Sequence, residues 1–123
     1  MFGHYINGKC EMGKGKPFDV TCPATDEIIE TFNAADKAQA QSALEAAQEA
    51  FKTWSKLPLN DRIGWIHKLR DAFFNERETL TDLLAKEVGL SYVEAKGEIE
   101  GTLIDTMNFY CDEVKRVYGT TLP

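Results

Sequence analysis

The sequence has no apolar run long enough to cross a bilayer and no basic stretch followed by an apolar segment at its N-terminus. A membrane-spanning helix needs about 20 consecutive apolar residues, and a secretory signal needs a basic segment before its apolar part. We therefore expect no membrane partner and a cytoplasmic location.

Cysteine is scarce, and its pattern matches no known framework. Cys10, Cys22 and Cys111 make an odd count, without a CxxC motif or a Cys/His cluster. Disulfide frameworks and zinc sites need such patterns, so we expect neither, and a reducing compartment fits. A nucleophilic thiol needs a cation, a base or a helix N-terminus nearby. Cys111 is instead followed by Asp112 and Glu113, which disfavour a thiolate.

Basic residues are fewer than acidic residues in this sequence. The 123 residues include 14 Lys and Arg against 20 Asp and Glu, which gives a net charge of −6. The phosphates of nucleic acid would be repelled by most of this chain, so nucleic acid is excluded as a partner. Hydrophobic content of 43% and charged content of 28% are those of a soluble globular domain.

Residues 1–35 predict extended structure with one β-hairpin. Residues 18–22 alternate apolar and polar side chains, as a half-buried strand does. Residues 28–32 are rich in β-branched and aromatic side chains, which favour a second strand, and the turn between them begins at Pro23. Residues 13–17 combine glycine and proline, which indicates a loop.

From residue 36 onward the apolar period becomes helical. Asp36 and Gln39 have the capping-box spacing that begins a helix, and Pro58 interrupts that helix. A second helix is predicted over 60–88, closed by Gly89 in the left-handed conformation. The series of apolar residues at three- and four-residue steps predicts which side chains are buried. These are Ala40, Ala43, Leu44, Ala47, Phe51 and Trp54, then Ile63, Ile66, Leu69, Phe73, Leu80, Leu83 and Leu84.

A third helix is predicted from the capping box of Ser91 and Glu94 to Gly119, with Ala95, Ile99, Leu103, Tyr110, Val114 and Val117 on its buried face. The fold class is thus a mostly α, α+β fragment, with a β-hairpin followed by three helices, two of them long. Alternating strands and helices are absent, and a parallel dinucleotide-binding sheet requires them.

Six short motifs lie in order along the chain, and together they carry a family resemblance. They are Tyr5–Lys9, Phe18–Thr25, Ala46–Trp54, Leu57–Arg62, Glu87–Leu90 and Glu94–Ile99. In this order and at this spacing the series resembles the start of an NAD(P)-dependent aldehyde dehydrogenase. The resemblance extends from Tyr5 to Gly119, and Cys22 departs from it, because the family usually has there an Asn that helps to fix the strand end.

The resemblance implies which reaction the parent enzyme catalyses and which part of its sequence carries the catalytic residues. In the parent enzyme a cysteine thiolate would form a thiohemiacetal with an aldehyde, hydride would pass to NAD or NADP, and the thioester would be hydrolysed to a carboxylate. The catalytic cysteine, its base and the nicotinamide-binding motifs lie further along in that family. We therefore expect no catalytic and no cofactor-binding residue here, and an inactive isolated chain that binds no cofactor.

The resemblance also places the segments. Residues 36–119 would pack on the outside of the cofactor-binding domain. Residues 120–123 would begin the crossover to the missing sequence, where the oligomerisation strands of the parent lie. The expected partners are the remainder of the aldehyde dehydrogenase chain and, through exposed strand edges or helix faces, other copies of this chain.

By position in the family, the resemblance implies two sites on this chain. Glu98, Thr102 and Thr106 would line the substrate tunnel, although carboxylates on one helix face more often form a solvated surface. A monovalent cation would be held by backbone oxygen near Val20 and Thr21 and by the acidic side chain of Glu87, because hard cations take oxygen ligands. Other ligands would come from the missing sequence.

Two alternatives belong to other classes. The chain could be a free-standing helical binding or assembly module derived from the same fold, which polar replacements on normally buried faces would favour. Leu69, Phe73, Leu103 and Val114 remain apolar, which favours the enzyme segment. A small unrelated helical enzyme is the third alternative, and it lacks a catalytic constellation.

Overall fold

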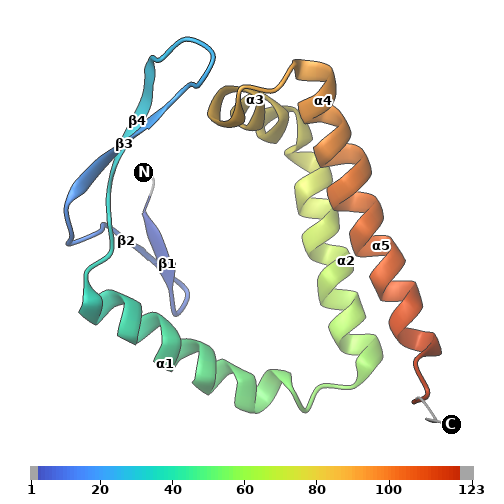
Figure 1. Cartoon of the computed structure of the whole chain (residues 1–123). Helices are drawn as coiled ribbons and strands as arrows, with labels where there is room; N and C mark the ends of the chain where they lie inside the picture. The colour runs from blue at the N-terminus through green and yellow to red at the C-terminus, as the bar shows by residue number, and fades with distance from the viewer. Residues whose placement is uncertain (1–2, 120–123) are drawn as a thin grey trace, which may run out of the picture. The chain divides into compact units, whose positions relative to one another are not determined.

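A computed structural model describes residues 3–119 as two pairs of short strands followed by a series of helices (Figure 1). The predicted fold class, mostly helical with antiparallel strands at the N-terminus, is confirmed. The predicted crossover at residues 120–123 lies outside the described residues. In chain order the elements are β1 (His4–Ile6), β2 (Lys9–Glu11), β3 (Pro17–Thr21), β4 (Ile28–Asn33), α1 (Lys37–Trp54), α2 (Leu59–Asn75), α3 (Arg77–Val88), α4 (Tyr92–Lys96), the π-helix η1 (Gly97–Leu103), α5 (Ile104–Glu113) and the 3-10 helix η2 (Val114–Arg116).

The chain divides into two compact units. The first unit comprises Met1–Leu57 with Lys86–Gly89, and the second comprises Pro58–Ala85 with Leu90–Pro123. Each unit has its own packing and is described by itself. No helix among residues 3–119 combines the length and the apolar character that a membrane span requires.

The strands β1 and β2 form a hairpin that the sequence analysis did not predict. Ile6 pairs with Lys9, so Asn7 and Gly8 are the two loop residues. Their φ angles are 49° and 78°, and two positive φ angles in a two-residue loop define the turn that best matches strand twist. Asn-Gly is the sequence signal for this turn, so the single predicted hairpin becomes two.

The predicted hairpin over 18–22 and 28–32 is confirmed as β3 and β4, to within one residue. The two strands are antiparallel, with Phe18 opposite Phe32 and an irregularity between Val20 and Thr21. The rings of Phe18 and Phe32 lie 6.0 Å apart, within the range of favourable aromatic pairs. Gly13, in the loop before β3, lies so close to the end of β4 that no side chain fits. A Cβ atom there would lie 2.0 Å from the backbone oxygen of Asn33.

The Gln39 side chain joins the start of α1 to the loop before β3. The predicted capping box is confirmed, since Asp36 accepts from the Gln39 amide at 2.8 Å and Gln39 Oε1 accepts from the Asp36 amide at 3.3 Å. Gln39 Oε1 also accepts from the Lys14 amide at 2.9 Å, and its Nε2 donates to the Met12 carbonyl at 3.0 Å. With only 3% of its surface exposed, this side chain satisfies three backbone groups at once.

The predicted burial of the α1 stripe is wrong for its three largest members. Leu44, Phe51 and Trp54 are 63%, 65% and 39% exposed. Within the described part of the first unit, Gln39 is the only buried residue. The reason is geometric, because α1 is contacted there mainly by β1, and a three-residue strand is too short to cover an 18-residue helix.

The single helix predicted over 60–88 is wrong, because the chain breaks into α2 and α3. At Glu76 the backbone leaves the helical region, with φ −97° and ψ 10°. Arg77 then caps the end of α2, since its Nη1 donates to the Phe74 carbonyl at 2.8 Å and its guanidinium lies 4.5 Å from the Phe74 ring centre. The predicted left-handed Gly89 after α3 is confirmed by a φ of 74°.

The third helical run is continuous from Tyr92 to Arg116, and its predicted capping box at Ser91 is confirmed. It is not uniform, because residues 97–103 form a π-helix. π-helical turns are rare and frequently mark functional sites. The run also ends earlier than predicted, since Val117 is extended with φ −83° and ψ 94°.

The second unit has a small core where α2 packs beside α5 (Figure 1). Arg70 Nη1 on α2 donates to Asn108 Oδ1 on α5 at 2.7 Å. Among the described residues of the second unit, the buried apolar ones are Ile63 on α2, Ala95 on α4, Ile99 on the π-helix, and Ile104 and Cys111 on α5. The predicted burial is therefore confirmed for three stripe residues, and it is wrong for Leu69, Leu83, Tyr110, Val114 and Val117, which are exposed.

Replacing Gln39 with Ala should lower the free energy of unfolding by about 2 kcal/mol, because buried backbone groups lose their partners. Urea denaturation followed by circular dichroism measures this change. Gln41→Ala is the matched control, because Gln41 is exposed and donates only to Glu45. Its cost should stay below about 0.5 kcal/mol, and equal costs for the two variants would show that the Gln39 bridge is not a stabilising contact.

Candidate functional site

The three residues predicted to line a substrate tunnel lie along one open hollow in the second unit. The hollow has a volume of about 430 Å³. Glu98, Thr102 and Thr106 follow one another at four-residue steps, which places them on one side of the helical run. The full lining is Leu84, Glu98, Ile99, Thr102, Leu103, Thr106 and Met107. Their role in a tunnel remains a prediction.

The chemistry of the hollow is apolar with a few polar groups. Four of its seven lining residues are apolar, two are threonines and one is a carboxylate. The side chains of Glu98, Thr102 and Thr106 have no hydrogen-bond or ion-pair partner among the described residues. A largely apolar surface with a few unoccupied polar groups is what small-molecule sites present.

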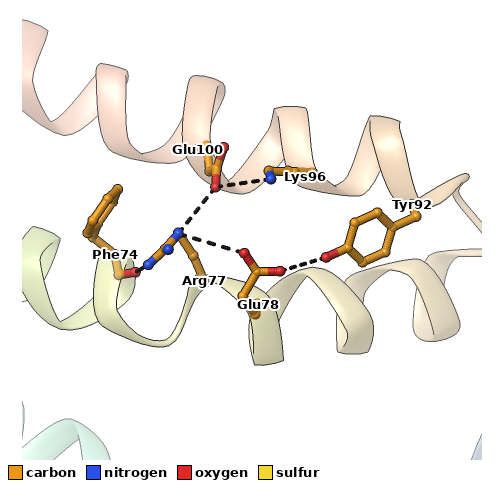
Figure 2. A network of polar contacts seen from close by, with 6 residues as sticks. All are labelled: Phe74, Arg77, Glu78, Tyr92, Lys96 and Glu100. Atoms are coloured by element: carbon orange, nitrogen blue, oxygen red, sulfur yellow. Dashed lines mark hydrogen bonds and ion pairs between the residues drawn. The ribbon is translucent and has the colours of Figure 1, made fainter.

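A polar network fixes the helices that carry the hollow (Figure 2). Arg77 reaches from the start of α3 to η1, with its Nε 3.3 Å from Glu100 Oε1. Lys96 Nζ lies 3.8 Å from the same oxygen. The Tyr92 hydroxyl donates to Glu78 Oε2 at 2.6 Å. The bend between α2 and α3 is thereby tied to both α4 and the π-helix.

This network perturbs two pKa values. The hydrogen bond from Tyr92 lowers the pKa of the Glu78 carboxyl, with a smaller effect from Lys96 and Arg77. The same bond raises the pKa of the Tyr92 hydroxyl, because deprotonation would remove the donor and place two negative charges together. The bond therefore contributes stability at neutral pH, where Glu78 is charged and Tyr92 is protonated.

The predicted cation ligands lie in the first unit, on β3 and near the end of α3. Val20 is half-buried and Thr21 exposed on β3, and Glu87 is exposed near the end of α3. The two segments do meet, since a Cβ atom on Gly89 would lie 2.8 Å from Pro23 Cγ. No cluster of three or more His, Cys, Asp or Glu side chains is present among residues 3–119. A monovalent site built on backbone oxygen stays a prediction.

Cys22 fixes the end of β3. Hydrogen bonds from the Thr25 side chain and the Ala24 backbone lower the pKa of the Cys22 thiol, because they stabilise negative charge on sulfur. The Cys22 amide donates to the Glu27 carbonyl at 2.8 Å, and the Asp26 amide donates to the Cys22 carbonyl at 2.8 Å. The backbone groups of Cys22 therefore close the turn that follows β3.

Two parts of the site were missed by sequence reasoning. Leu84 was assigned to the buried stripe of one long helix, and the break at Glu76 makes it part of the wall of the hollow. Arg77 carries no motif, so the sequence held no signal for its pairing with Glu100. Lys96 and Glu100 do have the four-residue spacing of a helical ion pair, and that signal could have marked this surface.

A profile of the aldehyde dehydrogenase family matches residues 11–123. The chain belongs to the aldehyde dehydrogenase family. The chain is similar to glutarate-semialdehyde dehydrogenase of Pseudomonas putida, with 32% identity over 97% of this chain and 25% of that protein. It is similar also to D-glyceraldehyde dehydrogenase (NADP(+)) of Picrophilus torridus, with 32% identity over 94% of this chain and 23% of that protein.

Solved aldehyde dehydrogenases share the same fold. An NAD-dependent benzaldehyde dehydrogenase from Corynebacterium glutamicum superposes with a TM-score of 0.85 at 27% identity, over 98% of this chain and 26% of that one. A succinate-semialdehyde dehydrogenase from Burkholderia pseudomallei gives 0.84 at 32% identity, over 97% and 25%. The chain therefore matches the N-terminal region of these aldehyde dehydrogenases and spans about a quarter of their length.

Tyr92→Phe should lower the urea midpoint at neutral pH, because Glu78 loses the donor that stabilises its charge. A carboxyl with a lowered folded-state pKa contributes stability above its ordinary pKa, and this contribution is lost as the pH falls through the lowered value. The difference between variant and wild type should therefore shrink at acidic pH. Nuclear magnetic resonance titration should show the Glu78 pKa returning toward its ordinary value in the variant.

Tyr110→Phe is the matched control for this prediction, because Tyr110 is 64% exposed and its hydroxyl has no partner among the described residues. It should leave both the midpoint and the Glu78 titration unchanged. A Tyr92→Phe penalty that is the same at neutral and acidic pH would mean that the Glu78 charge is not involved.

Proposed function

We propose that this chain is the N-terminal part of an enzyme that oxidises an aldehyde to a carboxylate with NAD or NADP as the electron acceptor. The observation that carries the proposal is the family match over residues 11–123. Similarity over nearly the whole chain to proteins about four times its length supports it. The similar proteins include an NAD-dependent benzaldehyde dehydrogenase and an NADP-dependent D-glyceraldehyde dehydrogenase, so the proposal covers either cofactor.

The described residues do not fit a dinucleotide site. Their strands form two separate two-stranded antiparallel sheets, whereas dinucleotides bind at the edge of a parallel sheet flanked by helices. We therefore place the cofactor site, the catalytic cysteine and its general base in sequence beyond these 123 residues. On this proposal the isolated chain carries out no dehydrogenation.

The first partner in this proposal is the remainder of the aldehyde dehydrogenase chain. No apolar side chain is buried among the described residues of the first unit, and Leu44, Phe51 and Trp54 are left open to solvent. Burial of an apolar side chain of this size contributes about 1.5–3 kcal/mol, so covering these three is a strong driving force. The alternative of a free-standing binding module is less well supported, because such a module needs a core in each unit.

The proposal also covers the cellular compartment of the protein and the oligomeric state of the parent enzyme. All three cysteines are free, which suits a reducing compartment such as the cytoplasm. We extend the proposal to an oligomeric parent enzyme. Without the remainder of the parent, the same apolar faces favour contacts between copies of the chain.

The enzymatic proposal is tested by expressing the complete natural reading frame that contains these residues, beside the 123-residue chain alone. The intact mass of each product is measured, and each is assayed for aldehyde-dependent reduction of NAD and NADP. We expect a much heavier, active product from the complete frame and no activity from the chain alone. Aldehyde oxidation by the 123-residue chain, or none by the complete product, would overturn the proposal.

The isolated chain should self-associate, and Phe51→Gln should weaken this association because Phe51 is 65% exposed on α1. Light scattering after size-exclusion chromatography should show a mass that rises with protein concentration, and the rise should be smaller in the variant. Ser42→Gln is the control, since it places the same side chain at an exposed α1 position without removing an apolar group. A wild-type chain that stays monomeric at high concentration refutes the expectation.

A further inference from the structure

The hollow in the second unit carries a charge that its own surroundings do not balance. Glu98 is the only charged residue of its lining. Glu98 is exposed and has no ion-pair or hydrogen-bond partner among the described residues. A ligand that enters the hollow therefore meets one uncompensated carboxylate.

Two cationic side chains of the same unit form ion pairs with Glu100 and not with Glu98. Arg77 and Lys96 both pair with Glu100, at 3.3 Å and 3.8 Å (Figure 2). Glu100 lies two positions after Glu98, and residues two apart on a helix do not share a face. The network that fixes the π-helix thus holds these two cations to Glu100 and leaves the charge of Glu98 unpaired.

The lining combines regularly spaced polar side chains with apolar side chains. Glu98, Thr102 and Thr106 form a polar row at four-residue steps, beside the apolar side chains of Leu103 and Met107. The row extends from Glu98 to Thr106, which is about two helical turns. A slender organic molecule that lies along the row would place its apolar stem against Leu103 and Met107 and one end near the Glu98 carboxylate, at a distance taken as about 5 Å for the estimate below.

We propose that Glu98 is a specificity-determining residue, which makes this hollow accept aldehydes whose far end is neutral or cationic and disfavour aldehydes that carry a carboxylate there. This inference rests on the proposed function for its identification of the ligand as an aldehyde. The ligand preference itself follows from the unpaired charge and the apolar lining.

Coulomb's law sets the expected size of the effect. For two like charges about 5 Å apart, the repulsion weakens binding about fourfold at the dielectric constant of water, and more than a hundredfold at the value typical of protein surfaces. The open hollow of this chain corresponds to the lower figure. A hollow covered by the remainder of the parent enzyme corresponds to values between the two.

The first test uses the complete enzyme and aldehydes of similar length. Succinic semialdehyde carries a carboxylate at its far end, pentanal is neutral and aminobutyraldehyde is cationic. We expect kcat/KM for pentanal to exceed that for succinic semialdehyde by at least about tenfold. Glu98→Gln should raise kcat/KM for succinic semialdehyde relative to that for pentanal by about tenfold and lower kcat/KM for aminobutyraldehyde relative to that for pentanal.

Asp105→Asn is the matched control, because it removes one negative charge from the same helical run at an exposed position outside the lining. It should leave the ratio of the kcat/KM values unchanged. An equal effect of the two substitutions would mean that net charge, and not the position of Glu98, sets the preference, which overturns the inference.

A second test reads ligand binding without any reaction. Amide resonances of residues 98–107 in the 123-residue chain are followed during titration with pentanol, pentylammonium and pentanoate. We expect pentanoate to bind about fourfold more weakly than pentanol and pentylammonium about fourfold more tightly. Glu98→Gln should make the three affinities equal.

The two tests separate the inference from the proposed function. If the complete enzyme oxidises no aldehyde but the charge preference appears in the titration, the proposed function falls and the preference of the hollow stands. If aldehydes are oxidised without regard to the charge of their far end, and Glu98→Gln changes nothing, the inference falls and the proposed function stands. Equal binding or no binding of the three probes to the wild-type chain also overturns the inference.

Discussion

Polar side chains that bridge separate backbone segments hold much of this chain in place, because few apolar side chains are buried. Gln39 is the clearest case, since one amide satisfies the amides of Asp36 and Lys14 and the carbonyl of Met12. Such bridges set local geometry, but each contributes only about 1 kcal/mol. Apolar burial normally supplies the larger part of stability, and the first unit has none among its described residues.

The second unit shows how such bridges position the helices around a hollow. Arg77 ends α2, begins α3 and pairs with Glu100 on the π-helix. These contacts connect the break at Glu76 to the π-helix. Leu84 on α3 and Glu98 on the π-helix both line the hollow. The apolar wall, the polar row and the unpaired charge are therefore consequences of how the helices are capped and tied together.

Local signals predicted local structure well. Both capping boxes, at Asp36 and Ser91, the left-handed Gly89 and the β3–β4 hairpin are short-range features that the sequence specifies by itself. Burial was predicted less well, because periodicity identifies an apolar face without showing what covers it. The helix break was missed because a long-range contact of Arg77 favours it, and the Asn-Gly turn was missed although its signal was present. The candidate site residues came from family position, and their shared hollow needed the fold.

We propose that the first unit gains most of its stability when the remainder of an aldehyde dehydrogenase covers it. Hydrogen exchange tests this most directly, by comparing the amides of α1 in the 123-residue chain and in the complete protein. The account predicts rapid exchange along α1 in the isolated chain and strong protection in the complete protein, because opening of an uncovered helix costs little free energy. Equal and strong protection of α1 in both proteins would contradict it.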